Sequence, residues 1–297
     1  MKILVFGGSG QVGRELQRSL CPLADIVVPG FSEVPRVDFK NPDALTKCIS
    51  TVMPDMVVNA AAYTAVDQAE NDKASADLVN AQAPGVIGRA AAAIGAPVIH
   101  YSTDYVFGGD GLGPWREVDE VAPVNYYGKS KLEGERQLMR ASPHSLVFRT
   151  SWVYSLYGKN FPKTMLRLAK EKDQLTIVDD QIGTPTSAPF LADVTACVIK
   201  QISQASNFSG IYHLAASGET SWFGFADFLL TRAEEMALIS RKPGLAATNS
   251  AAYTTPAKRQ LNSRLDTNKI RTTFGIRIPL WQQGVEQFLQ SIIAAKS

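Results

Sequence analysis

Apolar positions in the first half of the chain form short continuous runs, separated by segments with apolar residues at helical spacing. Five of these runs have the length and composition of buried strands, namely residues 2–6, 25–28, 56–59, 97–101 and 145–150. Continuous apolar runs are typical of parallel strands that are covered on both faces. Strands that alternate with helices in this way predict an α/β fold with a doubly wound parallel sheet over residues 1–150.

The pattern loosens after residue 150, where longer polar segments separate the predicted elements. Helical spacing is found at residues 160–171, 191–202, 222–239 and from about 280 onwards, and short strands are expected at 175–178 and 211–214. Residues 243–256 are small and polar, which predicts a mobile loop. We therefore expect a smaller C-terminal α/β region over residues 151–297, with some later segments returning to the first domain.

Glycines occupy the turn between the first predicted strand and the first predicted helix. Gly7, Gly10 and Gly13 form a Gly-x-x-Gly-x-x-Gly pattern, with Gln11 and Val12 between the last two. Such glycines permit a tight turn, a close backbone approach to phosphate and close packing of helix on sheet. The helix N-terminus then offers N–H groups to a pyrophosphate. The pattern predicts a Rossmann-type dinucleotide site, and its alternative is a tight turn without a ligand.

The residues after the second strand bear on the choice of cofactor. In strict NAD sites an acid directly after this strand binds the ribose hydroxyls. Here Glu33 comes late, and Ser32 and Arg36 offer groups for a 2′-phosphate. We therefore expect NADPH as the cofactor and leave NADH open as a second one. Asp38, which precedes Phe39, either reaches the adenine amine or forms the turn into the next helix.

Two hydroxyls end the fourth strand, and a tyrosine and a lysine lie on the helix that follows. Ser102 and Thr103 lie where open parallel sheets bind ligands, and their alternative role is helix capping. Tyr127 and Lys131 are four residues apart, so both side chains lie on one face of the helix. Taken alone, this pair also fits an ordinary helix surface. If it is functional, we expect the ammonium to lower the tyrosine pKa and to fit the phenol for proton transfer.

Composition and charge argue against several other classes of protein. Apolar residues make up 45% of the 297 residues and charged residues 20%, as in a globular rather than a disordered protein. The net charge of +2 is too small to indicate a nucleic-acid or membrane surface. The three cysteines and three histidines are scattered, so neither a disulfide framework nor a metal site is expected. No secretory signal or membrane-spanning run is visible, which predicts a cytoplasmic protein.

Taken together, these motifs resemble the extended short-chain dehydrogenase/reductase family over nearly the whole chain. Within that family, five further segments are similar to the dTDP-4-dehydrorhamnose reductases: residues 102–107, 149–154, 161–166, 180–186 and 262–265. The resemblance implies NAD(P)H-dependent reduction of the 4-keto group of dTDP-4-dehydro-L-rhamnose to dTDP-L-rhamnose. It also implies that residues 151–297 mainly bind the sugar nucleotide.

The resemblance assigns roles to individual residues. Tyr127 corresponds to the catalytic acid, Lys131 to the residue that holds the nicotinamide ribose, and Thr103 to the residue that orients the substrate carbonyl. Asp104 and Trp152 match residues of the sugar pocket. The cofactor groove, which also includes Tyr127 and Lys131, is matched by Gly7, Gly10, Gln11, Val12, Gly13, Asp38, Phe39, Ala62, Tyr63, Thr64 and Tyr101.

Other functions fit parts of the same pattern. A dehydratase of this superfamily typically has Asp-Glu after the threonine, whereas this chain has Asp104-Tyr105, which favours reduction. The alternatives are a non-catalytic NADP-binding regulatory subunit, such as the similar subunit of methionine adenosyltransferase, and a ketoreductase for another nucleotide sugar. Some related reductases dimerise around Mg²⁺ held by glutamates. Glu15 is present here, but Pro189 stands at a second such position, so Mg²⁺ is not expected and the protein is a monomer or a homodimer.

Overall fold

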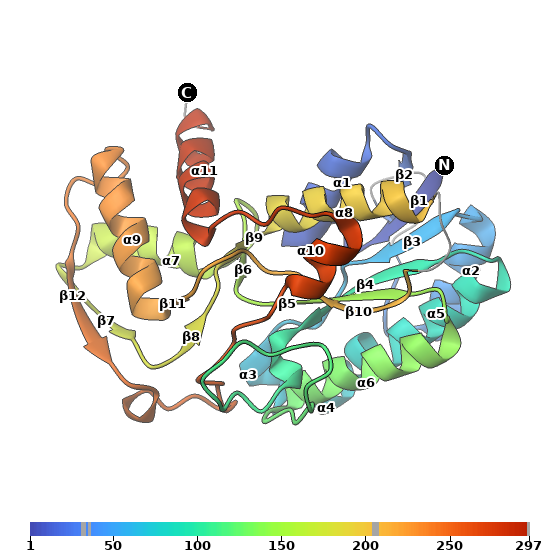
Figure 1. The fold of residues 1–297 in the computed structure, drawn as a ribbon, viewed down its shortest axis with the longest axis horizontal. Helices are drawn as coiled ribbons and strands as arrows, with labels where there is room; N and C mark the ends of the chain where they lie inside the picture. Colours follow the sequence, from blue (N-terminus) through green and yellow to red (C-terminus); the bar gives the residue numbers. More distant parts are fainter. Residues whose placement is uncertain (31–33, 35–36, 204–207, 296–297) are drawn as a thin grey trace.

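The computed structural model describes residues 1–30, 34, 37–203 and 208–295, and shows a sheet flanked by helices with a second lobe beside it (Figure 1). The sheet has six strands in the order β10-β5-β4-β3-β1-β2, and every neighbouring pair is parallel. The strands are β1 (Lys2–Phe6), β2 (Asp25–Val27), β3 (Met56–Asn59), β4 (Val98–Thr103), β5 (Leu146–Thr150) and β10 (Gly210–His213). The predicted α/β fold with a Rossmann-type parallel sheet is confirmed.

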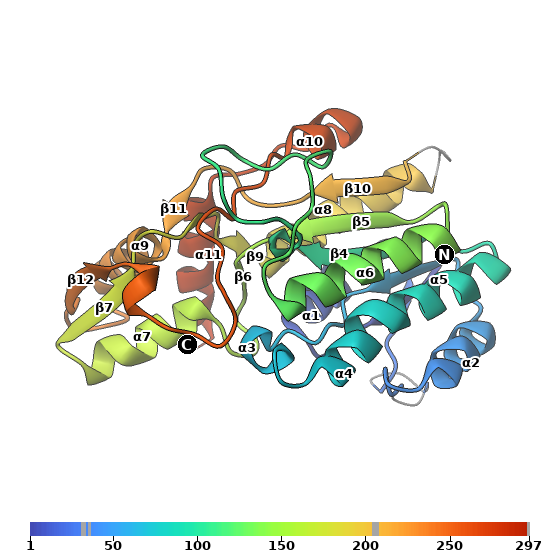
Figure 2. The same cartoon turned by 90° about the horizontal axis from the view of Figure 1, so that it is seen from below.

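Helices cover both faces of the sheet because successive strand residues alternate between two apolar cores. In β1, Ile3 and Val5 enter one core, and Leu4 and Phe6 enter the other. The first core is covered by α1 (Gln11–Leu20), α8 (Ala188–Ile202) and α10 (Asn268–Phe274). The second core is covered by α2 (Pro42–Val52), α5 (Ala83–Ala93) and α6 (Tyr126–Ala141), of which α5 and α6 lie side by side in Figure 2.

Residues 73–93 are helical throughout, but the pitch of the helix changes along them. The short α4 (Lys73–Ala76) leads into the π-helical η1 (Asp77–Gln82) and then into α5. The side chain of Asn80 in η1 accepts from the Tyr63 N–H at 2.8 Å and donates to the Tyr63 carbonyl at 3.0 Å. The π-helical turn therefore fixes the loop between β3 and the short helix α3 (Val66–Ala69).

The second lobe lies at the left of Figure 1 and combines short strand pairs with three helices. The pairs are β6 (Val153–Tyr154) with β9 (Thr186–Ser187), β8 (Ile182–Gly183) with β11 (Thr220–Ser221), and β7 (Gln174–Val178) with β12 (Gly244–Thr248). The helices are α7 (Phe161–Glu171), α9 (Trp222–Glu235) and α11 (Trp281–Ala294). All three helices contribute to one apolar core, which is separate from the two cores of the sheet.

The prediction of a mobile loop over residues 243–256 is wrong for its first half. Residues 244–248 form β12, which pairs in parallel with β7 over five positions. Leu245 packs against the core of the second lobe. Asp180 then accepts hydrogen bonds from the N–H and the hydroxyl of Ser250, at 2.9 and 2.6 Å. The partner strand is distant in sequence, so the local pattern of small residues carries no sign of the pairing.

A buried ion pair joins the sheet to α6. Arg149 on β5 donates to Glu135 on α6 at 2.7 and 3.0 Å, and the two side chains are only 3% and 2% exposed. The guanidinium also lies over the ring of Phe107, 5.1 Å from its centre. Removing one member of such a pair is strongly destabilising, because the other charge stays buried alone. The pair therefore fixes α6 against the strand next to β4.

We expect Glu135→Ala to lower the free energy of unfolding by about 3–5 kcal/mol, because the Arg149 charge stays buried without its partner. The double variant Glu135→Leu/Arg149→Met removes both charges and should recover most of that loss. Urea unfolding followed by circular dichroism measures both changes. A single variant as stable as the wild type would contradict this role for the pair.

Candidate active site

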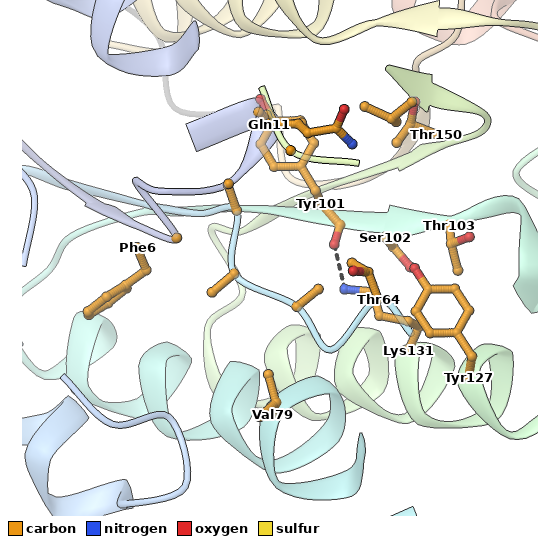
Figure 3. Close-up of a pocket in the computed structure, with 18 of the residues that line it drawn as sticks. Phe6, Gln11, Thr64, Val79, Tyr101, Ser102, Thr103, Tyr127, Lys131 and Thr150 are labelled. Atoms are coloured by element: carbon orange, nitrogen blue, oxygen red, sulfur yellow. Dashed lines mark hydrogen bonds between the residues drawn. The ribbon is translucent and has the colours of Figure 1, made fainter. Parts of the chain in front are cut away.

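A cavity of about 950 Å³ runs along the carboxyl ends of β1, β3, β4 and β5 and reaches the second lobe. Its volume is at the upper end of the range for cofactor and small-molecule sites. Figure 3 shows Tyr127, Lys131 and Thr103 in one part of the wall, and Phe6 further along it. Open parallel sheets bind ligands at this edge, so the position of the cavity indicates a ligand site.

The glycine turn presents bare backbone to the cavity. Gly7 has a left-handed φ of +80°, and a Cβ there would lie 2.5 Å from the Ala61 nitrogen. A Cβ on Gly13 would lie 2.1 Å from the Gly7 carbonyl oxygen, so Gly13 lets α1 pack closely against the turn. The N-cap of α1 is Gly10, which has no side chain to bond the first N–H groups of the helix. These groups are well placed to bind an anion such as a pyrophosphate.

Tyr127 lies in the first turn of α6 and lines the cavity. The helix begins here because the Asn125 side chain caps it, accepting from the Gly128 N–H at 2.9 Å. The Tyr127 phenol lies beside Thr103, and the Tyr105 ring contacts it edge-on at 5.5 Å. Burial raises the pKa of Tyr127 above its ordinary value of 10, and the Thr103 hydroxyl acts in the opposite direction. The phenol therefore keeps its proton at neutral pH.

The neighbouring Tyr126 is engaged elsewhere. Its hydroxyl donates to the Asp77 carboxylate at 2.7 Å, and the Lys73 ammonium lies 5.2 Å from the centre of its ring. The bond to Asp77 raises the pKa of Tyr126 to about 12. Helical spacing leaves both tyrosines as candidates, and Tyr127 is the one of the two that lines the cavity.

Lys131 lies one turn further along α6, and its side chain reaches the sheet. Its Nζ donates to the Tyr101 carbonyl oxygen at 2.6 Å, the bond drawn in Figure 3, and lies 3.2 Å from Nε2 of His100. Burial lowers the pKa of Lys131 to about 8, and Glu135 acts in the opposite direction. The expectation of a lowered Tyr127 pKa is wrong for this structure, because burial is the largest contribution and raises it.

Thr103 and Asp104 follow each other at the end of β4. Thr103 caps the turn η2 (Asp104–Val106), accepting from the Tyr105 N–H at 3.2 Å, and its hydroxyl donates to Asp104 Oδ1 at 3.0 Å. Thr103 therefore combines a capping role with a place on the cavity wall. Burial raises the pKa of Asp104 to about 6, while hydrogen bonds from Ser263 and Thr103 act in the opposite direction. Asp104 Oδ2 is buried without a hydrogen-bond partner among the described residues.

Two tryptophans line the cavity on the side of the second lobe. Trp152 follows β5 with a left-handed φ of +48°, and its ring stacks on that of Trp222 with 3.7 Å between centroids. A Cβ on Gly183 would lie 2.6 Å from the Trp152 ring, so this glycine makes room for the indole. Trp222 is absent from the residues predicted by sequence reasoning, because a tryptophan after a helix cap looks like any other core residue.

Most of the residues predicted for the site lie on the cavity wall. They are Gly7, Gly10, Gln11, Val12, Phe39, Ala62, Thr64, Tyr101, Thr103, Asp104, Tyr127, Lys131 and Trp152. Their positions bring the three predicted catalytic side chains and the glycine turn into one cavity. The individual roles of these residues stay predictions.

Three predicted residues, Gly13, Asp38 and Tyr63, are not on this wall. Gly13 lies behind the turn, as its contact with Gly7 shows. Asp38 accepts from the Lys40 N–H at 2.9 Å, so it forms the turn that leads into α2. The Tyr63 hydroxyl lies 3.5 Å from the Asp72 carboxylate. Ser32 and Arg36, the residues expected to bind a 2′-phosphate, lie outside the described part of the chain, as does the late acid Glu33.

Sequence reasoning also misses the segment that carries Gly158 and Lys159, which line the cavity near the glycine turn. Asn160 fastens this segment to the turn, since its Nδ2 donates to Gln11 Oε1 at 2.9 Å across 149 residues of sequence. A contact of this kind leaves no local signal in the pattern. The lysine brings a positive charge to the side of the cavity where an anion would bind at α1.

The described residues include no group of three or more His, Cys, Asp or Glu side chains arranged to hold a metal ion. Glu15, the glutamate considered for magnesium, pairs with Arg18 at 2.9 Å, and Arg18 in turn pairs with Asp193 at 2.8 Å. In the same described ranges, no helix has both the length and the apolar character needed to cross a bilayer.

Asp104→Asn tests the burial of the carboxylate in the site. The folded-state pKa of about 6 lies above the ordinary value of 3.8, so the folded protein binds this proton more tightly than the unfolded chain. The buried charge therefore opposes folding above about pH 6, and this effect fades as the pH falls towards 3.8. We expect the amide to raise the free energy of unfolding by about 1–3 kcal/mol at neutral pH and by far less near the ordinary carboxyl pKa. Urea unfolding at the two pH values measures the difference, and equal effects at both would contradict it.

Comparisons with known proteins identify the family to which the chain belongs. The RmlD substrate binding domain family matches residues 1–293. The dTDP-4-dehydrorhamnose reductase of Escherichia coli (strain K12) is 45% identical over 293 residues, which cover 98% of each chain. Two solved structures of dTDP-4-dehydrorhamnose reductases are similar to this chain. The one from Clostridium acetobutylicum has a TM-score of 0.88 at 34% identity, and covers 98% of this chain and 99% of that chain.

The second structure, from Bacillus anthracis, was determined in complex with NADP. It has a TM-score of 0.87 at 32% identity, and again covers 98% of this chain and 99% of that chain. Sequence and structure therefore agree over nearly the full length of both partners in each comparison. The chain belongs to the RmlD substrate binding domain family and, within it, to the dTDP-4-dehydrorhamnose reductases.

Proposed function

We propose that this protein is an NAD(P)H-dependent oxidoreductase that reduces the 4-keto group of dTDP-4-dehydro-L-rhamnose and so forms dTDP-L-rhamnose. One observation carries the proposal: Tyr127, Lys131 and Thr103 share a cavity with a glycine turn and a helix N-terminus. A phenol that keeps its proton, a hydroxyl beside it and an anion site are what a ketoreductase needs. Family membership supports the dTDP-sugar as substrate and a role in dTDP-rhamnose biosynthesis.

The residues of the chain fit a nicotinamide dinucleotide. The N–H groups of α1 suit the pyrophosphate, and Phe39 and Val37 provide apolar wall for the adenine end. We propose NADPH as the cofactor, supported by the NADP complex of the Bacillus anthracis reductase. Use of NADH and independence from Mg²⁺ are further parts of the proposal, and the protein is taken to act as a monomer or a homodimer.

The bound nicotinamide supplies the hydride that the keto carbon receives. The chain itself acts on the carbonyl oxygen. Tyr127 keeps its proton because it is buried, so it can donate that proton as negative charge develops on the oxygen. Thr103 lies beside the phenol, and its hydroxyl can donate to the same oxygen once its proton turns away from Asp104 Oδ1. Lys131 in its ammonium form favours the phenolate that remains on Tyr127.

The cavity favours reduction over water elimination. Elimination requires a base in addition to an acid, and the dehydratase pattern places a glutamate after the aspartate. Here Tyr105 occupies that position, and burial raises its pKa to about 12, so it does not act as a base at neutral pH. Asp104 is the sole acidic side chain among the described residues that line the cavity.

The second lobe supplies surfaces suited to a sugar nucleotide. The stacked rings of Trp152 and Trp222 offer a flat apolar wall, which suits the apolar face of a sugar or a base. The unpartnered oxygen of Asp104 can accept from a sugar hydroxyl. Lys159 is an exposed cation at the cavity, where it can pair with a diphosphate.

The activity is tested by supplying the keto sugar from the enzymes that make it, separately with NADPH and with NADH. We expect the absorbance of the reduced cofactor to fall as dTDP-L-rhamnose forms, because the Tyr127 phenol in the site keeps the proton that the reaction needs. Binding of NADPH, followed by its fluorescence, distinguishes the alternative. A protein that binds NADPH but leaves both cofactor and keto sugar unchanged would be a non-catalytic regulatory subunit, and the proposed function would be abandoned.

Paired tyrosine variants test the assignment of the acid. We expect Tyr127→Phe to lower kcat by about 10²–10⁴-fold, because the proton donor at the carbonyl oxygen is lost. Tyr126→Phe is the matched control, since it removes a neighbouring hydroxyl that bonds Asp77 instead of facing the cavity. It should change kcat by less than about tenfold, within the range of a non-catalytic change. Steady-state kinetics measures both, and the reverse ranking would refute the assignment.

A further inference from the structure

His100 is a buried histidine that does not line the cavity. It lies on β4 with 0% exposure, between Asn59 of β3 and Lys131 of α6. Side chains alternate along a strand, so His100 points to the α6 side of the sheet and its neighbour Tyr101 to the α8 side. Histidines buried this fully have their ring nitrogens hydrogen-bonded or leave a costly unsatisfied group. The partners of the two nitrogens therefore reveal what the residue does.

The hydrogen bonds around His100 fix the proton on its ring. The Ala61 N–H donates to Asn59 Oδ1 at 3.1 Å, which sets the orientation of the amide. Asn59 Nδ2 must then donate to Nδ1 of His100, 3.1 Å away. A neutral imidazole that accepts at one nitrogen carries its proton on the other. The proton of His100 is therefore on Nε2, which lies 3.2 Å from Lys131 Nζ.

This arrangement bears on the charge of Lys131. An ammonium group has three donors and no acceptor. Facing His100 Nε2–H, it would place two donors against each other inside the protein. A neutral amine instead accepts from Nε2–H with its lone pair while one of its own N–H groups donates to the Tyr101 carbonyl at 2.6 Å. All three polar groups are satisfied only in this second arrangement.

We propose that His100 is a positioning residue for Lys131: its Nε2–H donates to Nζ when the lysine is a neutral amine, and so favours that form over the ammonium while Nζ stays against the Tyr101 carbonyl. His100 thereby sets how readily Lys131 takes up the proton that makes it an ammonium. Asn59 is part of the same arrangement, because the hydrogen bond that its side-chain amide donates fixes the tautomer of the His100 ring. None of these three contacts requires a ligand.

The electrostatics of the surroundings agree with the proposal. Burial lowers the pKa of His100 well below 6.5, and the nearby Lys131 acts in the same direction, so the ring is neutral. Burial likewise lowers the pKa of Lys131 to about 8. Glu135 on α6 acts against this, but it is also the partner of Arg149 on β5, at 2.7 Å. The remaining titratable groups nearby, Tyr127 of α6 and Asp104 at the end of β4, lie on the cavity wall.

The consequence for catalysis rests on the proposed function. An ammonium at Lys131 favours the Tyr127 phenolate that proton donation leaves behind. Reduction should therefore weaken as the pH rises through the Lys131 pKa, which is about 8. By favouring the amine form of Lys131, His100 keeps the pH at which activity declines on the alkaline side close to neutral.

The tautomer and the lysine can be measured without substrate or cofactor. In ¹⁵N-labelled protein, ring nitrogen shifts report which nitrogen of His100 carries the proton, and the chain has three histidines to assign. We expect the Nε2–H form in the wild type. Asn59→Asp should switch His100 to the Nδ1–H form, because a carboxylate accepts where the amide donates. An Nδ1–H form in the wild type would overturn the proposal.

The lysine pKa is followed by NMR of ¹³Cε-labelled lysine. We expect His100→Phe to raise the pKa of Lys131 by about 1, the shift that matches the loss of one hydrogen bond to the amine form. His144→Gln is the matched control, since His144 is exposed, and it should leave the pKa unchanged. An unchanged pKa in folded His100→Phe would show that the histidine only fills space. If that variant does not fold, the smaller apolar change His100→Leu carries the same test, because it also removes the Nε2–H without adding a charge.

Kinetics provides the last readout. The alkaline limb of kcat/KM should move upward by about 1 pH unit in His100→Phe and stay in place in His144→Gln. A limb that stays in place although the lysine pKa has moved would overturn the link to catalysis. A protein that showed the predicted tautomer and pKa but no reduction of any keto sugar would refute the proposed function and leave the His100–Lys131 contact intact.

Discussion

The site depends on one constraint, which is that α6 docks tightly on β4 with its polar side chains satisfied. Two glycines let α6 pack closely on the segments beside the strand: a Cβ on Gly128 would lie 2.1 Å from the carbonyl oxygen of Tyr105 in η2, and one on Gly134 would lie 1.9 Å from that of Asn80 in η1. Lys131 then reaches across to the backbone of β4. Any larger side chain at either glycine would push α6 away from η2 or η1. The phenol of Tyr127 would move with it, since both residues belong to the first turns of α6.

This docking places ionisable groups where burial works against their charged forms. Burial raises the pKa of Asp104 and lowers that of Lys131, and it keeps the proton on Tyr127. Each of these groups opposes folding in its charged form. The second core and the buried pair between Glu135 and Arg149 hold the helix in place against that tendency. Catalytic sites commonly combine strained electrostatics with a rigid frame in this way.

Local patterns in the sequence predict the frame well. The five strands of the first half and the glycine turn follow from runs and spacings of a few residues, and the sheet contains all five. The pairing of β12 with β7 and the stack of Trp152 on Trp222 bring together residues far apart in the chain. A short stretch of sequence contains no pattern that predicts contacts between distant residues. For the same reason, the segment around Lys159 escapes prediction although it lines the cavity beside the glycine turn.

The tyrosine and the lysine show why spacing predicts position better than chemistry. Four residues of helix do place Tyr127 and Lys131 on one face, and both line the cavity. Spacing does not predict how deeply a side chain is buried, however, and burial has the largest effect on the pKa values of both groups. The long aliphatic stem of the lysine carries its Nζ to the strand, where a carbonyl and a histidine meet it. The shorter tyrosine stays in the cavity beside Thr103. In the proposed reaction the phenol acts on the ligand, whereas the contacts of the lysine Nζ are with the interior of the protein.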